Sequence, residues 1–74
     1  MGSDAATIVQ FDGGHSTFLE LPIGDVERAI SNGRLNEQEL IYIQAPNKGD
    51  NAVVIDPKKV VALFAATKRP PSTV

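Results

Sequence analysis

Apolar positions are densest at residues 52–66, which form the most β-branched part of the chain. This run predicts two strands, at residues 53–55 and 60–64. Asp56 and Pro57 predict a turn between them, because an Asp side chain bonds the backbone that follows it and Pro fixes the φ of the second turn position. Both faces of the second strand are apolar, which indicates a strand covered on both sides, with Val60 and Phe64 in the core. We expect this run to be the best protected part of the fold.

Alternating apolar residues predict a hairpin near the N-terminus. Residues 7–11 fit a strand with Val9 and Phe11 on its inner face. The sequence Asp12-Gly13-Gly14 then suits a tight turn, because Gly adopts left-handed conformations without a steric cost. Residues 17–21 fit the returning strand, with Leu19 inward and Phe18 outward.

A short amphipathic helix is expected at residues 25–32. Val26 and Ile30 fall on one helical face, and two carboxylates lie in the first turn, where the partial positive charge of a helix start favours them. Gly33 is expected just beyond the helix, in a left-handed conformation that ends it.

Residues 36–45 support two interpretations. Asn36 with Glu39 three positions later has the form of a helix capping box. The run of residues 40–43, Leu-Ile-Tyr-Ile, is rich in strand-forming residues, and Pro46 would end a helix after little more than two turns. We interpret residues 39–45 as a strand with Ile41 and Ile43 in the core and Leu40 and Tyr42 outward, joined to residues 53–55 through a polar loop at 47–51.

Together these elements predict an α+β fold in which a small antiparallel sheet of four or five strands, in ββαβββ order, has one helix packed on one face. A small closed barrel with the helix as a plug is the alternative. The chain has 74 residues, which is enough for one domain. We expect that domain at residues 7–66, a disordered N-terminus at 1–6 and a disordered, basic and Pro-rich tail at 67–74.

Composition argues against an enzyme and against a bound cofactor or metal. The chain has no Cys, and its one His, His15, lies in the expected hairpin turn, where no walls would exclude water. No apolar run approaches the roughly 18 residues of a membrane span, and no secretory signal is visible. A cytoplasmic protein is expected.

Charge is divided along the chain, which fits either solubility with intramolecular charge pairing or a protein whose acidic face and basic end steer a charged partner. Residues 1–47 carry a net charge of −5 and residues 48–74 a net charge of +3. Exposed aromatic groups rimmed by charge mark protein-binding patches, so the predicted partner-binding residues are Phe18, Tyr42, Lys58 and Lys59. The alternative is a small SH3-like or Sm-like nucleic-acid-binding module that uses this basic corner together with Lys68 and Arg69 of the tail. Because the total charge is acidic and aromatic residues are few, direct DNA binding is not expected.

Taken as a whole, a compact acidic chain with a basic C-terminal tail, no Cys and no active-site motif resembles the small phage-encoded regulators that bind host bacterial RNA polymerase. The resemblance implies a protein that works in the host cytoplasm and inhibits transcription initiation or modifies termination by contacting the polymerase. It rests on size and composition over the whole chain and not on a motif, so no functional residue is carried over. It leaves the oligomeric state open.

Overall fold

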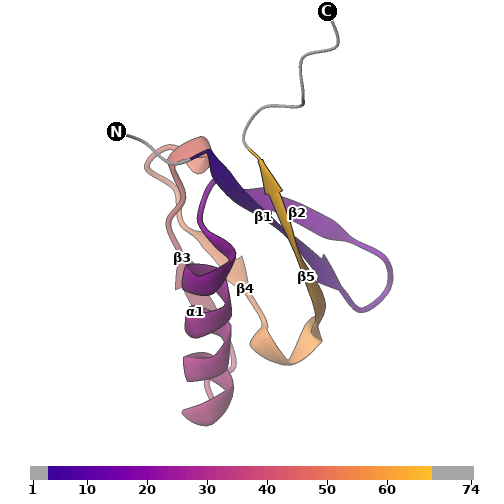
Figure 1. Ribbon diagram of the computed structural model, residues 1–74. Helices are drawn as coiled ribbons and strands as arrows, with labels where there is room; N and C mark the ends of the chain where they lie inside the picture. The colour runs from indigo at the N-terminus through magenta and orange to yellow at the C-terminus, as the bar shows by residue number, and fades with distance from the viewer. Residues whose placement is uncertain (1–3, 68–74) are drawn as a thin grey trace, which may run out of the picture.

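The computed structural model describes residues 4–67 and has an α+β fold with five strands and one α-helix (Figure 1). The order is ββαβββ, as the sequence predicts: β1 (Ala5–Phe11), β2 (Ser16–Leu19), α1 (Ile23–Leu35), β3 (Ile41–Ile43), β4 (Val53–Ile55) and β5 (Val60–Thr67), with short 3₁₀ turns η1 (Pro46–Lys48) and η2 (Pro57–Lys59). The strands form two antiparallel sheets and not one: a three-stranded sheet in the order β2-β1-β5 and a two-stranded sheet of β3 and β4. Within residues 4–67 no helix is both long and apolar enough to cross a membrane.

The core lies where the inner faces of both sheets meet α1. Its buried residues include Val9 and Leu19 from the three-stranded sheet, Val26 and Ile30 from α1, and Ile41, Ile43 and Ile55 from the two-stranded sheet, and the sequence pattern placed all of these except Ile55 on inner faces. Phe11 packs partly buried against this cluster. Thr7 is also fully buried, and its hydroxyl donates a hydrogen bond of 2.9 Å to the Leu21 carbonyl, which removes the cost of burying that polar group.

The first hairpin turns at the expected residues. Gly13 and Gly14 have φ values of 96° and 91°, and the Phe11 N–H donates to the His15 carbonyl across the turn at 2.7 Å. β1 begins at Ala5, so residues 5 and 6, expected outside the domain, belong to this strand, and Ala6 is buried. β2 ends at Leu19, earlier than expected.

The predicted end of the helix is wrong. α1 runs to Leu35, and Gly33 lies inside it, without a positive φ. The helix ends in a Schellman motif, in which the Gln38 N–H donates to the Gly33 carbonyl at 2.9 Å and the Glu37 N–H to the Arg34 carbonyl at 3.2 Å. Glu37 takes the left-handed position, with a φ of 53°.

Gly33 is needed for close packing and not for a turn. A Cβ on Gly33 would lie 2.6 Å from Ile41 Cγ2 and 3.3 Å from Pro57 Cγ. The missing side chain therefore lets α1 approach both β3 and η2, which could not be inferred from the helical pattern alone.

The strand at residues 39–45 is confirmed in type, but it is shorter, with Ile41 and Ile43 buried and Leu40 and Tyr42 exposed. The turn after Asp56 is also confirmed as η2, where the Asp56 side chain accepts a hydrogen bond from the Lys58 N–H at 2.9 Å. However, the two strands that this turn joins belong to different sheets.

β5 differs most from its prediction. It continues to Thr67, three residues beyond the expected end, and it is not covered on both sides, because Val60 is buried but Val61, Phe64, Ala65 and Thr67 are exposed. Phe64, expected in the core, is 50% exposed, while Leu63 packs against the core in its place. A bulge opposite Gln10 and Phe11 explains the change, because the extra residue, Val61, reverses which side chains point inward along the rest of the strand. Thr67, expected in the tail, belongs to β5, while the rest of the expected tail, residues 68–74, and residues 1–3 of the expected N-terminus lie outside the described residues.

Candidate functional site

The outer face of the three-stranded sheet carries an apolar row. Ile8, on the central strand, is directly opposite Phe18 on β2 and Phe64 on β5. Cross-strand partners have Cβ atoms about 4.5–5.5 Å apart, so the three side chains form one continuous strip across the sheet. Neither α1 nor the two-stranded sheet covers it, since both pack on the opposite face with Val9, Leu19 and Leu63.

The three strands of this sheet contain no charged residue: their sequences are AATIVQF, STFL and VVALFAAT. Among residues 4–67, the Lys and Arg side chains all come from α1, η1 and η2. The outer face is therefore unsuited to holding phosphates, which need nearby cations, and is suited to contact with another apolar surface.

The two edges of this sheet are treated differently. On β2, the Asn47 side chain from η1 donates to the Phe18 carbonyl at 2.8 Å and accepts from the Glu20 N–H at 3.1 Å. The amide group of Asn47 thus occupies the place of a neighbouring strand's backbone. On β5, the Arg34 side chain donates from Nη2 to the Val60 carbonyl at 2.8 Å and from Nε to the Pro57 carbonyl at 2.9 Å. Arg34 therefore provides a hydrogen-bond partner only at the beginning of β5, for the Val60 carbonyl.

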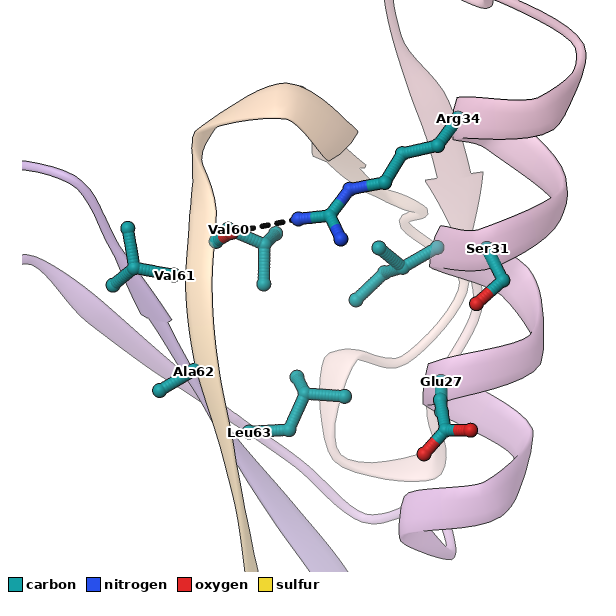
Figure 2. A pocket seen from close by; sticks show the side chains of 8 residues that line it. Glu27, Ser31, Arg34, Val60, Val61, Ala62 and Leu63 are labelled. Carbon is teal, nitrogen blue, oxygen red and sulfur yellow. Dashed lines mark hydrogen bonds between the residues drawn. The ribbon is translucent and has the colours of Figure 1, made fainter.

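A groove of about 140 Å³ lies between α1 and the first half of β5 (Figure 2). Ile30 and Leu63 supply apolar walls, and Glu27, Ser31 and Arg34 line its helical side at successive turns of one helix face. Figure 2 shows Arg34 reaching across the end of the groove to Val60, with Glu27 at the other end near Leu63. The groove is comparable in volume to a cavity of about 150 Å³ that binds benzene, so it can accept one apolar side chain.

The predicted partner-binding residues do not form one patch. Phe18 lies in the apolar row, partly buried by its neighbours. Tyr42 is 71% exposed and is paired with Val54 on the outer face of the other sheet. Lys58 and Lys59 are exposed on η2, between β4 and β5. The structure thus presents an aromatic strip, a separate Tyr42–Val54 pair and a basic corner.

Four residues of this region were not singled out as functional from the sequence: Ile8, Phe64, Arg34 and Asn47. Ile8 carried a usable signal, because it alternates with Val9 and so belongs to the outer face of its strand. Phe64 was misplaced because a bulge leaves no mark in an all-apolar sequence. Arg34 and Asn47 bond backbone groups 23 to 29 residues away, and no local pattern reveals such contacts.

Within residues 4–67, no group of three or more His, Cys, Asp or Glu side chains lies together as a metal site. His15 is exposed in the turn between β1 and β2, as expected. Every buried side-chain nitrogen or oxygen described has a hydrogen-bond partner, so no buried polar atom in this part of the chain awaits a ligand.

Comparison with protein-family models, with curated proteins and with solved structures finds no match to this chain.

Proposed function

We propose that this protein is a small, non-enzymatic regulator that acts by binding another protein through the outer face of its three-stranded sheet. The observation that carries the proposal is the row of Phe18, Ile8 and Phe64 on a sheet without charged residues, in which Phe64 is 50% exposed and Phe18 and Ile8 are half-buried. Large apolar side chains are costly to leave in water, and central aromatic groups commonly dominate the binding energy of protein interfaces.

The partner that we propose is bacterial RNA polymerase, and binding of this protein to the polymerase would inhibit or modify transcription. Support for this choice is the resemblance in size, acidity and composition to small phage-encoded regulators of the polymerase. Charge distribution supports a protein over DNA, because the apolar face lacks cations and the exposed basic groups of η2 number only two, Lys58 and Lys59.

The proposal is tested by titrating the fluorescently labelled chain against purified bacterial RNA polymerase, its isolated subunits and duplex DNA at two salt concentrations. Phe64→Thr keeps a strand-forming residue but removes the ring, and it should weaken polymerase binding at least about tenfold. Val54→Thr is the matched control, because Val54 is 51% exposed but lies on the other sheet. That control should bind within about threefold of the original chain. Tight binding to DNA alone, or equal binding by both variants, would overturn the proposal.

A further inference from the structure

The backbone of β5 has an open edge whose donors and acceptors can be assigned from the hydrogen bonds of β1. The Phe11 N–H bonds His15 on the β2 side, whereas the Asp12 N–H bonds the Lys59 carbonyl on the β5 side. Because backbone groups alternate along a strand, the even-numbered residues of β1 face β5 and pair with Ala62, Phe64 and Ala66. Leu63 and Ala65 therefore direct their N–H and C=O groups away from β1, along the open edge.

These two residues are left unprotected in the described part of the chain. Arg34 caps the Val60 carbonyl, and none of the cross-element hydrogen bonds between residues 4 and 67 involves Leu63 or Ala65. Edge strands are usually protected by charge, Pro or shortness, and β5 has eight residues with neither charge nor Pro. By contrast, β2 is only four residues long and is capped by Asn47.

The groove lies beside this edge and determines which side chains an added strand could bury. A residue opposite Leu63 would place its side chain on the inner face, in the groove against Ile30. A residue opposite Phe64 would place its side chain on the outer face, beside the apolar row. Backbone pairing and side-chain burial are thus offered together, which is how strand-adding domains obtain affinity and specificity.

Charges at the two ends of the groove select the occupant further. Among the described residues, Glu27 has no ion-pair partner, because the neighbouring Arg28 pairs with Asp25. Within residues 4–67, Arg34 bonds only backbone carbonyls, so no carboxylate in that range neutralises its positive charge. Arg34 lies seven positions after Glu27, a rise of about 10 Å along the helix, which is close to the span of about three strand residues. A segment with a central apolar residue, an acidic residue towards Arg34 and a basic residue towards Glu27 complements this groove.

We propose that β5 binds an extended segment of a partner protein as a fourth strand, with one apolar side chain in the α1–β5 groove flanked by an acidic and a basic residue. This inference rests on the proposed protein-binding function and names the form that the partner takes. An extended segment is favoured over a second copy of this chain because α1 borders the edge. A second copy would have to bring its own α1 into the same space.

The test uses a displayed library of random decapeptides selected on the full chain, followed by anisotropy titrations of the enriched peptides. Enriched sequences should share an apolar residue with an acidic residue on one side and a basic residue on the other. Ala65→Pro removes an outward N–H without removing a bond to β1, and it should weaken peptide binding at least about tenfold. Ala65→Thr keeps the N–H and should bind the peptides within about threefold of the original chain.

Glu27→Gln should reduce the enrichment of basic residues at one end of the peptide. Spectra of the labelled chain should show the largest amide shifts at Leu63 and Ala65.

Peptides that bind Ala65→Pro as well as the original chain, or no enrichment at all, would overturn strand addition. So would a dimer in sedimentation analysis that dissociates in Ala65→Pro, because a second copy would then occupy the edge. The two proposals can fail separately. If Ala65→Pro still binds polymerase while Phe64→Thr does not, the outer face is the binding surface and strand addition is wrong. If the enriched peptides depend on Ala65 but polymerase is not bound, strand addition stands and the proposed partner is wrong.

Discussion

Two residues at the end of α1 exchange the roles that a sequence pattern would give them. Glycine is a common residue in the left-handed position after a helix, yet here Glu37 holds that position and Gly33 lies inside the helix. Both choices have a steric cause that single substitutions can test.

Gly33→Ala should destabilise the protein although Ala is the better helix former. The added Cβ would lie 2.6 Å from Ile41 Cγ2, so α1 must move away from β3 and η2. Overpacking of this kind costs about 1–3 kcal/mol, against a gain of about 1 kcal/mol in helix propensity, which leaves a net loss of up to about 2 kcal/mol in the free energy of unfolding. Urea unfolding measures it. Gly24→Ala is the control, because no atom lies within 4 Å of the added Cβ and the substitution should be neutral or stabilising. Equal effects at both positions would contradict the close approach.

Glu37→Gly should instead stabilise the protein. The φ of 53° at Glu37 places Cβ in a strained position that costs about 1–2 kcal/mol, whereas Gly adopts it freely and loses about 0.5–1 kcal/mol through greater freedom of the unfolded chain. The expected net gain is up to about 1.5 kcal/mol in the free energy of unfolding. Gln38→Gly in the same turn lacks this benefit and serves as the comparison. A lower stability for Glu37→Gly would argue that the left-handed conformation is not formed there.

Among the elements, β5 is the strand whose structure differs most from the sequence-based prediction. Its backbone should show alternating amide exchange, with Ala62, Phe64 and Ala66 slow because they face β1, and Leu63 and Ala65 fast because they face the open edge. β1, paired on both sides, should be the slowest strand, in place of the run at residues 52–66. Exchange followed by NMR in the absence of a partner measures both. Uniform protection along β5 would mean that its edge is already occupied.

Most elements were predictable because they are encoded by local periodicity. Alternation in the first hairpin, the turn at Gly13 and Gly14, the helical face of Val26 and Ile30, and the outward position of Tyr42 all follow from residues close in sequence. The ends of the elements and the sheet to which each strand belongs were not predictable, because they depend on contacts between distant segments. β4 and β5 belong to different sheets although only four residues separate them, and no pattern within residues 52–66 indicates this division.

The candidate site was predictable only in part, for the same reason. Phe18 follows from alternation within its strand, whereas Phe64 required knowledge of the bulge at Val61, and the groove required the approach of α1 to β5. The open edge itself became visible only after the hydrogen bonds of β1 were assigned to each side.

At the scale of the whole molecule, apolar contact and charge are carried by different parts of the surface, so they should affect different steps of binding. The three-stranded sheet is uncharged, while Lys58 and Lys59 are exposed on η2, away from the apolar row. Charges outside a contact act mainly during approach, over a Debye length of about 10 Å at 0.1 M salt. Lys58→Glu or Lys59→Glu should therefore change the association rate with RNA polymerase severalfold and leave dissociation nearly unchanged, with an effect that fades as salt is raised. Phe64→Thr should mainly change the dissociation rate and leave association nearly unchanged, since the ring contributes only once the surfaces are in contact.

Surface-binding kinetics at 50 and 300 mM salt distinguish effects on association from effects on dissociation. Lys48→Glu on η1 is the comparison, because it makes the same charge change at another site. If the lysine substitutions acted on dissociation and kept their effect at high salt, the η2 corner would belong to the contact itself, and the binding surface would have to extend from the apolar row to that corner.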